Sequence, residues 1–163
     1  MVGALGRYTF EDVTWKPGLG GIFYWGSGDS DPTTGDINTF NSLYPLGHAH
    51  WGQIDNFSGQ NLLDYGVQAS IKPHEKLSIV SQWHYFDLAH ATDRIYNIAG
   101  AGLAGSGDKN VGNELDFVGT YTHSKSFNVQ LGYLMFFYGD AVNNGGLARS
   151  DAEQFYLQGT YMF

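Results

Sequence analysis

Cysteine is absent from this 163-residue chain, which excludes a disulfide framework and any thiolate metal site. Charged residues make up only 15%, against a usual share of about 25%. Basic residues are the scarcer sign, and the net charge of −8 argues against nucleic acid as a partner, because phosphate binding needs a basic face. No apolar run reaches about 18 residues, so a transmembrane helix is excluded.

Aromatic residues and glycine are abundant instead, with 16% aromatics and 23 glycines. This combination favours β-structure with many turns over a helical bundle. Apolar and polar residues alternate with period 2 along most of the chain, as in 62–72, where Tyr65 and Val67 fall on one face and Asp64 and Gln68 on the other. The alternation predicts seven strands, over residues 3–13, 19–27, 62–72, 77–86, 114–122, 127–137 and 154–163.

The predicted strands and their connections have the dimensions of a membrane barrel. Each clear run is about 10 residues long, which is the length that a tilted transmembrane strand needs. Tight lysine-containing turns (15–18, 72–76, 123–126) alternate with long connections (28–60, 88–112, 139–152). We therefore expect an all-β fold, an antiparallel transmembrane β-barrel with an extracellular loop over 28–60. The alternative is a water-soluble β-barrel or sandwich that binds a ligand, with the apolar face as its core.

Both ends of the chain carry expectations of their own. The last predicted strand ends on Phe163, which resembles the signal that barrel-assembly machinery reads in bacterial outer-membrane proteins. An odd number of antiparallel strands would close only through a parallel pair, which bacterial single-chain barrels avoid. We therefore expect residues 1–163 to be one barrel domain or the C-terminal part of a larger one. The first 30 residues show no secretory signal, so either the signal has been removed or the true start lies upstream.

The segment GDINTFNSLYPLGHAHWGQIDNFSGQNL (35–62), with GNELDFVGTYT (112–122) and the terminal DAEQFYLQGTYMF (151–163), resembles the alginate export family of outer-membrane porins. The shared features, in order, are Gly35-Asp36, Thr39-Phe40-Asn41, Leu43-Tyr44-Pro45, His48, Gly52, Asp55, Asn61, Gly112, Glu114 and Leu115. The resemblance implies a barrel of about eighteen strands, of which this chain would supply the last seven. It also implies passive movement of a hydrophilic solute or polysaccharide across the bacterial outer membrane.

The polar side of the predicted strands would line the pore. These pore-lining candidates are Arg7, Glu11, Asp64, Gln68, Gln82, His84, Glu114, Asp116, Asn128, Gln130, Gln154 and Gln158. Carboxylates outnumber cations among them, which repels a polyanion and favours cations or neutral sugars. The resemblance implies an arginine-rich lumen for the exporter that names the family, so this chain departs from a wall suited to alginate.

The aromatic stretch 35–48 fits neither strand nor helix periodicity. Apolar residues such as Phe40 and Pro45 could pack on the loop itself or on the barrel wall. The polar members of the long loop would then constrict or cap the channel mouth: Asp36, Asn41, Tyr44, His48, Asp55 and Asn61. This prediction makes the loop a selectivity element.

No cofactor, catalytic residue or metal site is predicted. Asp29, Asp31 and Asp36 form a weak Ca²⁺ candidate without EF-hand spacing. His48 and His50 could bind a transition metal if extended, although loop histidines more often hydrogen-bond to backbone. An outer-membrane hydrolase built on His84, Asp87 and Ser78 or Ser81 is a weaker alternative, because no nucleophile motif surrounds them. The expected partners are outer-membrane lipid and lipopolysaccharide, the barrel-assembly machinery, and a hydrophilic solute or oligosaccharide.

Overall fold

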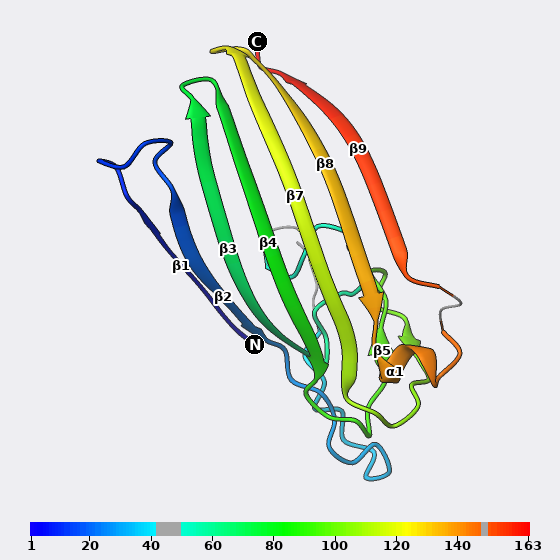
Figure 1. Ribbon diagram of the computed structural model, residues 1–163. Helices are drawn as coiled ribbons and strands as arrows, with labels where there is room; N and C mark the ends of the chain where they lie inside the picture. Colours follow the sequence, from blue (N-terminus) through cyan, green and yellow to red (C-terminus); the bar gives the residue numbers. More distant parts are fainter. Residues whose placement is uncertain (42–49, 148–149) are drawn as a thin grey trace.

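Seven long strands lie side by side in one curved antiparallel sheet (Figure 1). The computed structural model describes residues 1–41, 50–147 and 150–163. The sheet order is β1-β2-β3-β4-β7-β8-β9, so each strand pairs with the next long strand in the chain. The long strands are β1 (Val2–Thr9), β2 (Gly18–Trp25), β3 (Leu62–His74), β4 (Leu77–Leu88), β7 (Asn110–Ser124), β8 (Phe127–Tyr138) and β9 (Ala152–Tyr161).

Tight turns join the strands at one end of the sheet, and long connections gather at the other (Figure 1). The long connections contain a small two-stranded sheet and a short helix. The sheet is formed by β5 (Ile95–Tyr96) and β6 (Gly102–Leu103), and the helix is α1 (Asp140–Asn143). The period-2 pattern missed these three elements because they are too short to show a period. Among the described residues, no helix is long and apolar enough to cross a membrane.

The first predicted strand is shorter than its pattern suggested. Residues 10–17 form a turn, in which Phe10 N–H donates to the Pro17 carbonyl over 2.8 Å and Lys16 adopts a left-handed conformation. Glu11 therefore lies beyond the end of β1, exposed and paired with Lys16 at 2.8 Å. The expectation that Glu11 stands on the strand wall was wrong, because alternation continues by chance into the turn.

The outer face of the sheet is apolar and uncovered. The register places its large side chains in cross-strand rows. Those that are exposed are Tyr8, Leu19, Tyr65, Val67, Trp83, Phe117, Tyr121, Leu131, Tyr133, Phe137, Phe155, Leu157 and Tyr161. A water-soluble sandwich would bury such a face against a second layer, whereas a membrane barrel turns it to lipid. The exposed apolar face thus favours the membrane interpretation.

The buried core lies on the opposite, inner face, at the loop end of the sheet. It contains Tyr24, Trp51, Phe57, Leu62, Phe86, Leu88, Ile95, Val111, Phe136, Ala141 and Val142. Strand residues and loop residues contribute to it together, so the loops pack into the concavity of the sheet at its loop end. Antiparallel all-β architecture, seven strands in one sheet and polar-apolar alternation are confirmed. The sheet is open, with β1 and β9 at its edges in the described part of the chain.

Candidate functional site: a loop segment docked on the inner wall

Residues 50–61, called here the inward segment, turn back from the long loop and dock on the inner face of the strands. The backbone N–H groups of Gln53 and Ile54 both donate to Oε1 of Glu114 on β7, the second over 2.9 Å. Gly52 lies directly against this carboxylate with a φ of +76°, and a Cβ there would collide with the Glu114 side chain. Glycine at position 52 therefore allows the segment to approach the wall.

Aromatic side chains hold the rest of the inward segment. Trp51 Nε1 donates to the Phe57 carbonyl over 2.9 Å, which closes the segment on itself. The Phe57 ring packs 5.6 Å from that of Phe136 on β8 and 6.2 Å from that of Phe86 on β4. From β2, the Tyr24 hydroxyl donates to the Gly59 carbonyl over 2.7 Å. Side chains from four strands, β2, β4, β7 and β8, thus contact this one loop segment.

Beneath the inward segment lies a strip of buried ionisable groups. Asp64, His84, Glu114 and Asp116 are each no more than 2% exposed. His84 Nδ1 and Asp64 Oδ2 are hydrogen-bonded over 2.8 Å, and His84 is the direct cross-strand partner of Glu114. These residues share the inner face, as the alternation predicted. Their burial, however, separates them from any solute on that side of the sheet.

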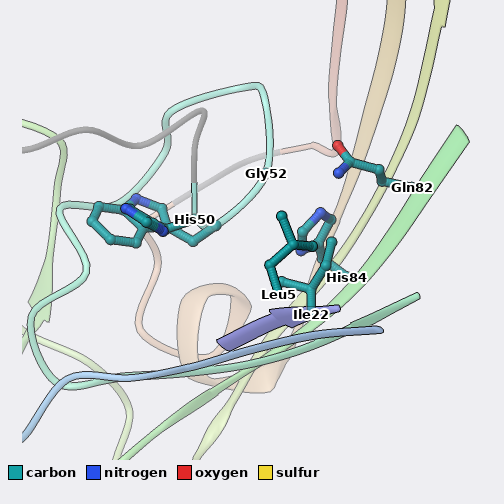
Figure 2. A pocket seen from close by; sticks show the side chains of 7 residues that line it. Leu5, Ile22, His50, Gly52, Gln82 and His84 are labelled. Atoms are coloured by element: carbon teal, nitrogen blue, oxygen red, sulfur yellow. The ribbon is translucent and has the colours of Figure 1, made fainter. Parts of the chain in front are cut away.

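A small cavity of about 30 Å³ separates part of the inward segment from the wall (Figure 2). His50, Trp51 and Gly52 line it from the loop, and Leu5, Ile22, Gln82 and His84 line it from the strands. This is room for about two water molecules. The cavity is too small for a sugar or any larger solute, so it belongs to the joint between loop and wall.

Beyond the inward segment, the inner face is open and nearly uncharged. Its predicted pore-lining residues are Arg7, Gln68, Gln82, Asn128, Gln130, Gln154 and Gln158. All seven stand on the inner face, which matches the predicted side of each strand. Their contact with a passing solute stays a prediction.

Comparison with known protein families identifies this architecture. The family model described as "Alginate export" matches residues 1–155, which is nearly the whole chain. The chain belongs to the alginate export family. No curated protein is similar enough to count as a relative. The family is one of outer-membrane export channels, and the antiparallel sheet with an apolar outer face agrees with that class.

Three of the residues on which the resemblance rested have a structural role in this alginate export family chain. Gly52 and Glu114 meet at the joint between inward segment and wall. Asn61, buried and left-handed at φ 51°, receives the His90 N–H on its Oδ1 and donates through Nδ2 to the carbonyls of His90 and Arg94. The motif residues at these positions therefore fix the loops on the barrel wall.

The predicted constriction residues are spread over the loop. Asp36 and Asn41 are exposed, whereas Asp55 and Asn61 belong to the inward segment. Tyr44 and His48 lie outside the described residues. The structure thus brings a loop onto the inner wall, as the constriction hypothesis requires, through residues 50–61. Whether any of the six residues contacts a solute stays a prediction.

The Ca²⁺ candidate residues of the alginate export family chain serve as turn formers. Asp29 Oδ1 accepts the Asp31 N–H over 3.0 Å, and Asp31 Oδ1 accepts both the N–H and the hydroxyl of Thr33. Hydrogen bonds from Thr33 lower the pKa of Asp31. Within the part of the chain that the structure describes, no group of three acidic or histidine side chains could hold a metal ion.

The residues of the hydrolase alternative do not converge. His84 pairs with Asp64 on the inner face. Asp87 and Ser81 pair in register with outer-face positions of β3, so they point away from His84. Ser78 shares the inner face but lies six residues along β4 from His84.

The inward segment itself was missed at the level of sequence, although a signal for it exists. Alternation fails at the loop ends of three strands, at 23–25, 85–86 and 134–137, where both faces are apolar. An apolar inner face at one end of a strand indicates that something covers it there. Trp51 and Phe57, two of the aromatic residues in the connection 28–60, were candidates for that cover.

Proposed function

We propose that this chain forms part of the wall of a bacterial outer-membrane channel through which hydrophilic solutes or polysaccharide diffuse. One observation carries the proposal: a single curved sheet is apolar and exposed on its outer face, and polar on its inner face with a loop segment docked there. An outer face of this kind fits lipid, and the inner face fits an aqueous passage narrowed at the loop end.

The open sheet edges support a larger barrel. Within the described residues, β1 and β9 each lack one hydrogen-bonded neighbour. Unpaired backbone groups are costly in a bilayer, so additional strands must pair with both edges. A total of about eighteen strands, as the family resemblance implies, would enclose an aqueous lumen.

The orientation follows from the asymmetry between the two ends. Lys16, Lys72, Lys76 and Lys125 lie in or beside the tight turns, which we assign to the periplasm. The acidic long connections, including 28–60, would face outward, where divalent cations could bridge their carboxylates to lipopolysaccharide. The terminal aromatic strand would serve recognition by the barrel-assembly machinery.

Selectivity would come from the polar wall and the docked loop, without covalent chemistry or an energy source. The carboxylates of the wall are buried, so they give the passage little open negative charge. Amide side chains on the open part would then favour neutral solutes. The lumen would therefore be polar and nearly neutral, and not acidic as the sequence suggested. A polyanion would still be disfavoured, because the open wall offers it few cations.

The test is single-channel recording of the full-length gene product in planar bilayers. We expect defined conductance steps with weak ion selectivity. Deletion of residues 36–48 should raise the conductance and loosen selectivity, and substitution of exposed Ile37 by alanine should change neither. A protein that stays monodisperse without detergent and produces no conductance would overturn the proposal and favour a soluble ligand-binding domain.

A further inference from the structure

A polar groove of about 570 Å³ lies over the inner face of β8 and β9 and extends to the open edge of β9. It is lined by Gln53 of the inward segment and by Gln130, Gln154, Tyr156 and Gln158 of the strands, with Leu157 and Gly159 at its margin. The volume falls within the range of about 300–1,000 Å³ typical of small-molecule sites. No lining residue carries a carboxylate or a cation.

The Tyr156 ring lies flat on the wall. Its cross-strand partner is Gly132, which is buried although it has no side chain, and a Cβ at position 132 would overlap the tyrosine ring. The Tyr156 hydroxyl donates to Gln130 Oε1 over 2.9 Å, which fixes the ring in this position. One ring face therefore rests on β8, and the other is directed to the groove.

Amides surround this aromatic platform. Gln130 Nε2 donates in turn to Thr120 Oγ1 over 3.3 Å, so a chain of hydrogen bonds runs from β9 through β8 to β7. Gln154 and Gln158 stand two residues either side of Tyr156 on the same face and are exposed. Each glutamine offers a carbonyl acceptor and two N–H donors, which is the complement of a vicinal diol.

We propose that this groove is a subsite for a neutral sugar unit, with a pyranose ring stacked on Tyr156 and its hydroxyls bound by the flanking glutamines. The C–H groups on one side of a pyranose carry partial positive charge, which the negative face of an aromatic ring attracts. The subsite rests on the proposed channel function and names the solute class that the wall recognises.

The groove discriminates against a uronate unit. A sugar carboxylate there would find no cation among the described lining residues. A carboxylate without a cationic partner would lose hydration on entering the groove and gain no ion pair, which is a source of specificity for neutral sugars.

The experiment measures block of the full-length channel by a neutral oligosaccharide, maltohexaose, and by an anionic one of equal length, hexagalacturonate. We expect maltohexaose to block at a concentration at least about tenfold below that of hexagalacturonate. Tyr156→Ala should raise the half-blocking concentration of maltohexaose about tenfold. Gly132→Ala keeps the tyrosine but tips its ring off the wall, and should raise it about threefold or more.

Gly119→Ala is the matched control, since a Cβ there meets no atom within 4 Å, and it should leave block unchanged. Calorimetric titration of maltohexaose into the detergent-solubilised protein measures binding independently of conductance. Conductance steps with no difference between wild type, Tyr156→Ala and Gly132→Ala would overturn the subsite and leave the channel intact. Sugar binding without conductance would keep the subsite and overturn the channel. Equal or stronger block by hexagalacturonate would also overturn the proposed sugar class.

Discussion

The two halves of the inner face have the same strands and the same alternation but opposite environments. In the covered half, represented by Tyr24, His84, Phe86, Glu114 and Phe136, side chains are no more than 2% exposed beneath the inward segment. In the open half, Gln154 and Gln158 are exposed, and Gln68 and Gln130 are half-buried. Strand register determines which face of the sheet a side chain is on. Whether an inner-face side chain is exposed to solvent depends on a loop from elsewhere in the chain.

The largest expected effect on the difference between the two halves comes from removing the Trp51 side chain of the inward segment. Trp51→Ala should destabilise the covered half by about 3–5 kcal/mol, because a buried indole leaves a cavity. Heat- or urea-induced unfolding in detergent measures the loss, and single-channel conductance should rise as the segment leaves the wall. Ile37→Ala, at 86% exposed, should stay within about 0.5 kcal/mol of wild type. Equal stability of Trp51→Ala and wild type would show that the segment does not depend on this packing.

Glu114 allows a finer separation of hydrogen bonding from charge. Glu114→Ala removes the acceptor of two backbone N–H groups and should loosen residues 52–54 by about 1–3 kcal/mol. Glu114→Gln keeps a carbonyl acceptor and removes the buried charge, so it should retain the docked segment. Hydrogen exchange of the Gln53 and Ile54 amides reports the difference. Faster exchange in both variants would mean that the charge, and not the acceptor, holds the loop.

The loops above the covered half should respond to acid through Asp93. Burial raises the pKa of this carboxyl, but donors from Thr39, the Asp29 and Arg94 N–H groups and Tyr96 outweigh that effect and lower it below 3.8. A lowered pKa in the folded state adds stability that is present above about pH 4 and is lost as the pH falls through the folded value. Protease cleavage of the external loops should therefore increase only below about pH 4.

Asp93→Asn should produce the same loosening at pH 7, because an amide offers one acceptor oxygen in place of two. Cleavage of this variant should also lose most of its dependence on pH in the acid range. If the wild type and Asp93→Asn show the same acid response, another group controls the loops.

The smallest expected effect belongs to the open half. Arg7→Gln removes an exposed cation from the inner face and should shift the reversal potential in a KCl gradient toward cation preference by a few millivolts. Screening should shrink the shift at about 1 M salt, where the Debye length is about 3 Å, relative to about 0.1 M. A shift of the opposite sign would contradict the placement of Arg7 in the passage.

The sequence predicted the wall well and its cover poorly, for a physical reason. Alternation in strands such as 77–86 is local, so Gln82 and His84 could be assigned to one face from their spacing alone. His84 stacks on Phe86, whose ring in turn packs against Phe57 of the inward segment, so its surroundings depend on a loop that is distant in sequence. The Tyr156 platform is likewise a pairing effect, because it needs the glycine that register places opposite. Both contacts join segments that are far apart or on different strands, so neither produces a repeating pattern within one stretch of sequence.

The sheet order also constrains the sequence of events in folding. Every long strand pairs with the next long strand in the chain, so the wall can grow hairpin by hairpin, through tight turns at one end and long connections at the other. The inward segment lies between β2 and β3, yet its Phe57 ring needs Phe136 of β8. This contact must therefore wait until four further long strands, β3, β4, β7 and β8, have been made. The part of the docking that depends on Phe136 therefore forms only after β8 is in place, so the passage narrows later than the first hairpins of the wall form.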